Sequence, residues 1–147
     1  MNTAEKILRG LAHSYSMDAN PLYCWEAWRV SRESGEPLPE FASDYFDRVA
    51  AQFVTMPSPE PKQLNRAVVE ATEFRGGPFS RAQRHGVWEG TGQPSKPLLF
   101  SLTLAEMAEG ASVDEAWRRV EEEWPVSYSQ VRDAYYEMRP HYHLRER

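Results

Sequence analysis

The 147-residue sequence has a single cysteine, Cys24, no long apolar run and no excess of basic residues. One cysteine cannot form an intramolecular disulfide or a cysteine-rich zinc site, and it fits a reducing compartment. No run approaches the roughly 20 apolar residues that span a bilayer, and the N-terminus lacks the apolar core of a signal peptide. The formal net charge of -5 provides no general attraction to phosphate. These absences predict a cytoplasmic protein, outside the membrane, whose partners are other proteins.

The chain does contain the material for a hydrophobic core, since 41% of its residues are hydrophobic and 12% are aromatic. Disordered chains have far less of both, so we expect a folded protein. A chain of this length corresponds to one domain and can bury roughly two-thirds of its unfolded surface. We therefore predict a single domain over residues 1–147.

Apolar residues recur at intervals of three and four over most of the chain, which is the pattern of amphipathic helices. The sequence therefore predicts an all-α fold, a compact bundle of about six to eight helices. The N-terminal part, residues 1–56, is expected to hold three helices, which run from Thr3 to about Tyr15, from Pro21 to Ser34 and from Glu40 to Thr55.

Prolines and glycines separate this N-terminal part from the rest of the chain. Residues 57–97 are rich in both and are predicted to hold one or two helices between loops, one of them over residues 63–74. Residues 98–139 are predicted to form the C-terminal helices, and residues 140–147 a tail. The apolar run 98–109 fits either a buried helix or, in its first half, a strand, and its length favours a helix.

Helix starts can be located from capping residues. Asn20 is predicted to cap the second helix, because its side chain can accept a hydrogen bond from a backbone N–H of the first turn. Ser112 with Glu115, and Ser127 with Gln130, have the spacing of a capping box, in which each side chain bonds the other residue's N–H. Two C-terminal helices should therefore begin directly after these serines.

The connection Trp124–Ser127 between those two helices is short enough for a helix-turn-helix. The segment Val113–Arg139 resembles that family, whose second helix enters the major groove of DNA. Pro125 stands where the family commonly has glycine, and Glu121 where it usually has alanine, so we describe the motif as degenerate. The resemblance rests on the apolar positions Val120, Trp124, Val126, Val131 and Ala134.

The segment from Asn20 to Ala50 is similar to the front of small uncharacterised proteobacterial proteins, some from prophage-like contexts. Those proteins pair such a segment with a helix-turn-helix-like C-terminal end. The resemblance implies a shared helical fold and no particular activity. It rests on Asn20, Pro21, Leu22, Tyr23, Trp25, Pro37, Leu38 and Pro39.

DNA binding is the second of two functions that the sequence suggests. A basic loop with aromatic neighbours and the start of the last helix could contact phosphates and base edges. Acidic residues nevertheless outnumber basic ones by 7 to 4 between residues 112 and 139, which opposes attraction to DNA. The residues that would carry this function are Arg75, Arg81, Arg84, Tyr128, Gln130 and Arg132.

The first function is that of a non-enzymatic protein-interaction or regulatory module, with a homodimer as one form of it. The first three helices are richer in aromatic side chains than a core of this size requires, and such residues anchor interfaces. The alternative is a fully internal aromatic core. The expected interface residues are Tyr23, Trp25, Trp28 and Tyr45.

The sequence predicts no catalytic residue, metal or cofactor. Cys24 could act as a nucleophile if paired with His13, but nothing near it in the sequence lowers its pKa, and cysteine is commonly a small buried hydrophobe. His141 and His143 could bind a metal, but no nearby carboxylate or cysteine completes a site of three or four ligands. We therefore expect the protein to act by binding.

Overall fold

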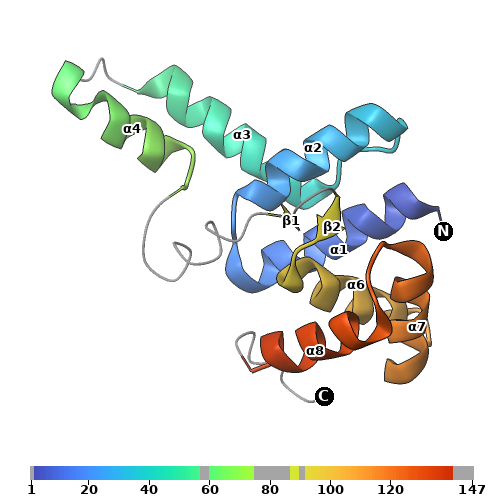
Figure 1. The fold of residues 1–147 in the computed structure, drawn as a ribbon. Coiled ribbons are helices and arrows are strands. Elements are labelled where there is room, and N and C mark those ends of the chain that lie inside the picture. The colour runs from blue at the N-terminus through green and yellow to red at the C-terminus, as the bar shows by residue number, and fades with distance from the viewer. Residues whose placement is uncertain (1, 57–59, 75–86, 90–91, 141–147) are drawn as a thin grey trace.

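The computed structural model describes residues 2–56, 60–74, 87–89 and 92–140, and almost all of the regular structure there is helical (Figure 1). The predicted all-α fold is confirmed. The described α-helices are α1 (Thr3–Asp18), α2 (Leu22–Ser34), α3 (Glu40–Thr55), α4 (Leu64–Ala71), α6 (Lys96–Ala108), α7 (Val113–Glu123) and α8 (Tyr128–Met138).

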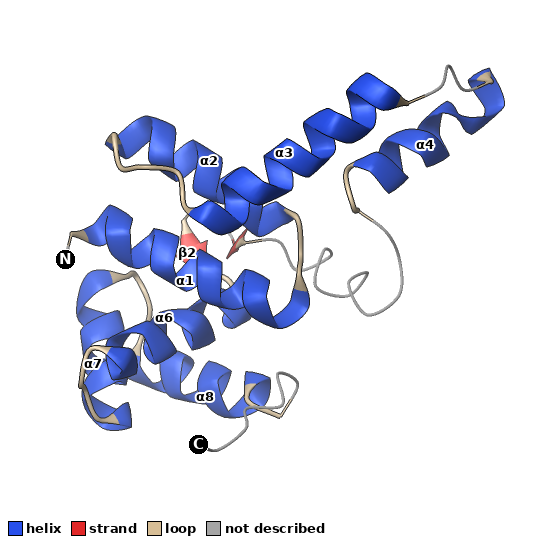
Figure 2. Ribbon diagram, turned by 180° about the vertical axis from the view of Figure 1, so that it is seen from behind, coloured by secondary structure: helices blue, strands red, loops and turns tan. Residues whose placement is uncertain are grey.

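Helix α6 lies at the centre of the molecule, against α1, α7 and α8 (Figure 2). All residues from Leu98 to Thr103 are buried, so this part of α6 has no exposed side. A helix that is apolar all round is stable only when it is covered on every side. Gly10 of α1 permits the closest approach, because a Cβ atom built there would lie 3.1 Å from Leu102 Cδ2.

Local capping determines where the C-terminal helices begin, as the sequence predicts. Ser112 caps α7 and Ser127 caps α8, and both capping boxes are complete in both directions. The side chain of Asn20 accepts a hydrogen bond from the N–H of Leu22 at 3.1 Å, but the residue at the N-cap of α2 is Pro21, one position after the predicted Asn20. The predicted starts are therefore correct to within one residue.

Some predicted boundaries are wrong. Helix α1 continues to Asp18, beyond the predicted end at Tyr15, and stops where Ala19 adopts a left-handed conformation with φ 53°. The helix predicted over residues 63–74 is shorter: a 3₁₀ turn, η1 (Pro61–Gln63), replaces its first residue, and α4 ends at Ala71, two residues before Glu73 adopts φ 62°.

One small element, a two-stranded antiparallel ladder, was not predicted from the sequence. Strand β1 (Trp88–Glu89) pairs with β2 (Gln93–Pro94), and the N–H of Ser95 donates to the carbonyl of Val87 at 2.9 Å. Each strand has two residues, which is too short to show an alternating pattern.

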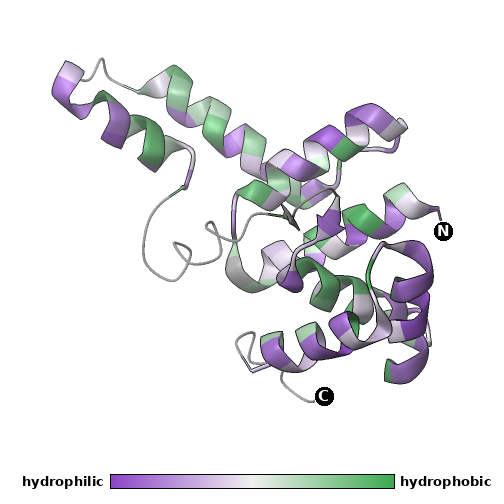
Figure 3. Cartoon of the chain, in the orientation of Figure 1, coloured by the Kyte–Doolittle hydropathy of each residue, from purple (hydrophilic) through white to green (hydrophobic). Residues whose placement is uncertain are grey.

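The second half of α3, η1 and α4 project away from the other helices, and we call residues 46–56 and 60–71 the arm (Figures 1 and 2). Apolar residues extend along both helices of the arm, beyond the body of the protein (Figure 3). Among the described residues, no helix is long and apolar enough to cross a membrane.

Candidate interaction surface

Large apolar side chains are exposed mainly on the arm and on the neighbouring helix α2. Scattered exposed apolar residues are ordinary, but a contiguous group of them marks a binding surface. Among the described residues, the large hydrophobic side chains classed as exposed are Trp25, Trp28, Phe53, Val54, Leu64, Val68, Val69 and Tyr136.

Ring contacts connect the residues of α2 with those of α3. The ring of Trp25 packs edge-on against Phe46, with centroids 5.0 Å apart, and its indole N–H donates to the hydroxyl of Tyr45 at 3.1 Å. Trp28 lies one turn further along α2 and carries the guanidinium of Arg32 over its ring, 5.8 Å from the centroid. Trp25 and Phe46 therefore join α2 and α3 in one aromatic contact, and Trp28 is a further exposed aromatic residue on α2.

This surface continues along α3 into the arm. Phe46, Ala50, Phe53 and Val54 are three or four residues apart, so they share one side of the helix. Ala50, Phe53 and Val54 are exposed, Val54 to 85%, while Phe46 is partly buried beneath Trp25. We call the set Trp25, Trp28, Phe46, Ala50, Phe53 and Val54 the aromatic ridge.

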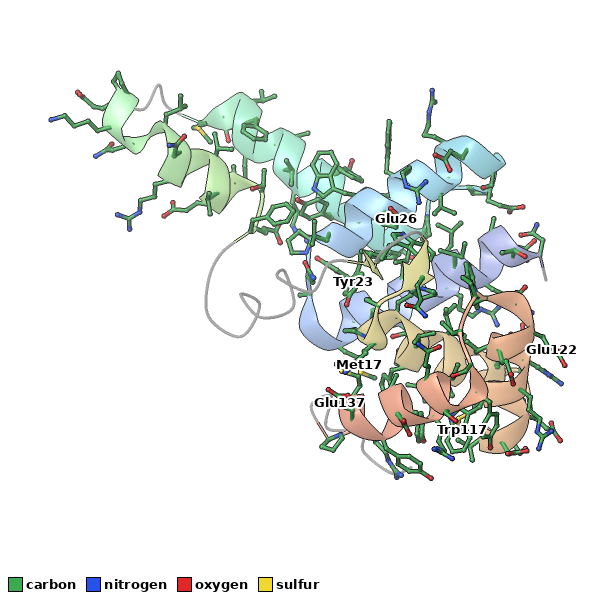
Figure 4. All side chains as sticks on the ribbon, in the orientation of Figure 1. Met17, Tyr23, Glu26, Trp117, Glu122 and Glu137 are labelled. Atoms are coloured by element: carbon green, nitrogen blue, oxygen red, sulfur yellow. The ribbon has the colours of Figure 1, made fainter. Side chains whose placement is uncertain are left out.

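Of the four predicted interface residues, two are exposed and two are buried. Trp25 and Trp28 are 45% and 48% exposed, as an interface role requires, whereas Tyr23 and Tyr45 are fully buried. Tyr23 points from α2 into the body, where the helices meet (Figure 4). Tyr45 lies under Trp25, and its hydroxyl donates to the carbonyl of Thr72 at 2.7 Å. Both tyrosines belong to the core and cannot contact a partner in this conformation.

Phe53 was missed because the sequence shows only that it shares the apolar stripe of its helix. In a helix of this kind the stripe ordinarily packs on a neighbour. Here α3 extends past the N-terminal end of α2, so no described helix covers that side of its last two turns (Figure 1). The two predicted helices are nearly equal in length, so the sequence held no clear sign of this.

The base of the arm is held by a polar cluster. The guanidinium of Arg48 forms two hydrogen bonds of 3.1 Å with the carboxylate of Glu73, and a third of 3.0 Å with the hydroxyl of Tyr15. These bonds raise the pKa of Arg48, so its charge is permanent. Glu73 adopts a left-handed backbone conformation, φ 62°, where the chain leaves α4. The cluster joins α1, α3 and the end of α4.

An open groove of about 860 Å³ lies between α3 and α4, away from the ridge. Its apolar lining comes from Ala51, Met56, Ala67 and Ala71. Three carboxylates and one guanidinium also line it. Its charged lining residues are Arg48, Glu60, Glu70 and Glu73.

The predicted DNA-reading residues of α8 are engaged in contacts within the protein. The side chain of Gln130 accepts the N–H of Ser127 in the capping box, at 2.8 Å. Arg132 pairs with Asp133 at 3.3 Å, and the hydroxyl of Tyr128 donates to Asp114. This bond and the ion pair with an arginine lower the pKa of Asp114, which keeps a negative charge beside α8.

The other part of the predicted nucleic-acid site, Arg75, Arg81 and Arg84, lies outside the described residues, as do His141 and His143. The described apolar positions of the helix-turn-helix-like segment are placed as expected. Val120, Val126, Val131 and Ala134 are buried, and Trp124 is partly buried against Trp88. A DNA-binding role for the helix pair stays a prediction.

Cys24, the nucleophile considered from the sequence, is buried, and His13 is partly buried. Burial raises the pKa of the Cys24 thiol to about 12, so it is protonated at neutral pH. Burial lowers the pKa of His13, whose Nδ1 lies 3.4 Å from the hydroxyl of Ser101. Ser101 also shares a hydrogen bond with Ser14. Within the described ranges, no group of three metal-ligating side chains comes together.

Comparison with known proteins gives no relative: no family model, no curated protein and no solved structure matches the chain.

Proposed function

We propose that the protein is a non-enzymatic interaction module that binds a protein partner through the aromatic ridge. The observation that carries this proposal is the exposure of Trp25 and Trp28 on α2 and of Phe53 and Val54 on α3. Keeping these side chains in water costs free energy that burial against a partner would recover, at about 25 cal/mol per Å².

The composition of the ridge supports a protein partner over a small molecule. Tryptophan and phenylalanine are enriched in protein interfaces, and tryptophan is among the commonest residues that carry the binding energy. Ligand pockets are concave, whereas the ridge lies along the outer sides of two helices. Trp25 is held by its contacts with Phe46 and Tyr45, so it loses little side-chain freedom on binding.

Placement of the protein in the cytoplasm is part of the same proposal. It is supported by the free, buried thiol of Cys24, which suits a reducing compartment.

Site-specific photo-crosslinking tests the proposal. A benzophenone amino acid at position 28 should form an adduct in living cells that produce the protein, because Trp28 is at the edge of the contact. The adduct should disappear when Phe53→Glu is added, since a charge would then be buried in the interface. It should persist with Tyr136→Glu, the matched exposed aromatic on α8.

Two results contradict the proposal. One is the absence of any adduct at position 28, and the other is an adduct that Phe53→Glu leaves unchanged. Once a partner is purified, Trp28→Ala should weaken its binding by at least about tenfold, as expected for an anchoring tryptophan.

A further inference from the structure

We infer that the partner of the aromatic ridge is a second copy of the same chain, with the two α3 helices crossing at Ala50. The inference rests on the proposed interaction role and specifies its partner. Homodimers commonly have two-fold symmetry, in which the same patch on each chain contacts its equivalent. The ridge has the pattern that such a contact requires.

The pattern places an apolar residue four positions on either side of Ala50, whereas three positions on either side stand Asp47 and Phe53. A small exposed residue stands at the middle of the stripe, with Phe46 four residues before it and Val54 four residues after it. When two helices cross antiparallel at Ala50, Val54 of the second copy lies opposite Phe46 of the first. The same contact recurs on the other side of the axis. Alanine at the crossing point permits the helix axes to approach to about 8 Å.

The two tryptophans flank this crossing. Trp25 packs on Phe46, so an aromatic wall stands beside the position that Val54 of the second copy would occupy. Val54 is 85% exposed, the highest exposure of any large hydrophobic side chain in the described residues. A β-branched side chain with few rotamers loses little entropy when it inserts into such a position.

The exposed apolar area of the ridge corresponds to the apolar part of a dimer interface. Trp25, Trp28 and Phe53 are each 44 to 48% exposed, and with Val54 they leave on the order of 400 Å² of apolar surface per chain. Two copies would together bury about 800 Å², half of the ~1,600 Å² of a standard interface. An apolar share of about that size is typical, with a polar rim supplying the rest.

The rest of the arm leaves this side of α3 open. Helix α4 packs on the other side, where Arg48, Ala51 and Gln52 line the groove between the two helices. None of the ridge residues lines that groove. A second copy could therefore approach the ridge without displacing α4.

Sedimentation equilibrium of the full chain tests the inference. The unmodified protein should show the mass of two chains of 17.0 kDa. Ala50→Lys and Ala50→Glu should each shift the mass to one chain, because like charges would meet at the two-fold axis. Both substitutions are at an exposed helical position and should leave the fold intact, which circular dichroism would verify.

Mixing the two variants gives the decisive measurement. If position 50 meets position 50 of the second copy, the Lys and Glu chains should pair and restore the double mass. Ala51→Lys, the adjacent exposed alanine on the groove side, should remain a dimer.

A monomeric unmodified protein would overturn the inference, as would dimers that survive both Ala50 variants or a mixture that fails to pair. A monomer that still gives a Phe53-dependent adduct with another protein in the crosslinking experiment would leave the proposed function standing and refute only self-association. A monomeric mass together with no adduct at position 28 would refute both.

Discussion

The hydroxyl of Tyr45 donates a hydrogen bond to the carbonyl of Thr72, 27 positions later in the chain, at 2.7 Å. Tyr45 is in α3 and Thr72 directly follows α4, so this bond fastens the returning helix of the arm to the body. The same hydroxyl accepts the indole N–H of Trp25. One buried oxygen therefore links the aromatic ridge to the end of α4.

Tyr45→Phe should lower the free energy of unfolding by about 1 to 2 kcal/mol, because it removes both hydrogen bonds of a buried hydroxyl. Hydrogen exchange should quicken in α4 more than in α6, since the bond to Thr72 holds only the former. Denaturant unfolding and exchange mass spectrometry would measure these effects. Tyr136→Phe, on an exposed side chain, should change stability by less than about 0.5 kcal/mol. Equal exchange in both helices would contradict the anchoring role.

The carboxylate of Glu106 forms ion pairs with Lys6 at 3.1 Å and Arg119 at 3.3 Å, and its side chain is 6% exposed. Glu106→Gln should cost roughly 2 kcal/mol, since removing one member of a buried network leaves the others without compensation. Urea denaturation would measure the loss. The matched control is Lys96→Met, which breaks an exposed ion pair with Glu137 and should cost less than about 1 kcal/mol. Equal losses of stability in the two variants would show that burial does not strengthen the ion pairs of Glu106.

Stability should fall as the pH drops below about 6.5, because burial lowers the pKa of His13 beneath its ordinary value of 6.5. The unfolded chain then binds a proton at this residue that the folded chain excludes. The loss of stability caused by His13 is absent above that pH and grows as the pH falls towards the pKa of His13 in the folded state. Denaturant unfolding of the wild-type protein and His13→Gln at about pH 7.5 and about pH 5.5 would test it.

His13→Gln should lose less stability between the two pH values than the wild type does. The other histidines are present in both proteins, so the difference isolates His13. Identical losses in the two proteins would show that His13 titrates alike in the folded and unfolded states.

We expect a random-sequence DNA duplex to leave the light-scattering mass of the protein unchanged at low salt. The charge of the C-terminal helices opposes phosphate binding, and Gln130 and Arg132 are engaged within α8 and its cap. A heavier complex that dissociates steeply with added salt would instead support DNA binding. Arg132→Ala and Arg84→Ala would then locate the contact, with Arg66→Ala as a control on the arm.

Crosslinking from the ridge and the DNA test together distinguish the two functions that the sequence suggests. An apolar interface should respond little to salt, whereas a contact with phosphates should weaken strongly.

Most helix boundaries could be predicted from the sequence because they depend on neighbouring residues. Ser112 and Ser127 begin α7 and α8, and Gly35 ends α2 with φ 80°, a conformation that glycine adopts without strain. Helix α3 has the bounds that its apolar spacing predicts, Glu40–Thr55. Capping and periodicity depend on residues that are close together in the chain, so they can be predicted from the sequence.

The candidate surface could be predicted only in part, because exposure depends on which helices meet. The sequence alone placed Tyr23, Trp25, Trp28, Tyr45 and Phe53 in the same aromatic set of the first three helices, and only the first four were named as interface residues. Tertiary packing then separated them. Helix α3 extends beyond α2, so Phe53 is exposed to solvent, while Tyr23 and Tyr45 are buried. The spacing of apolar residues determines which side of a helix avoids water, but only the neighbouring helices decide how much of that side is covered.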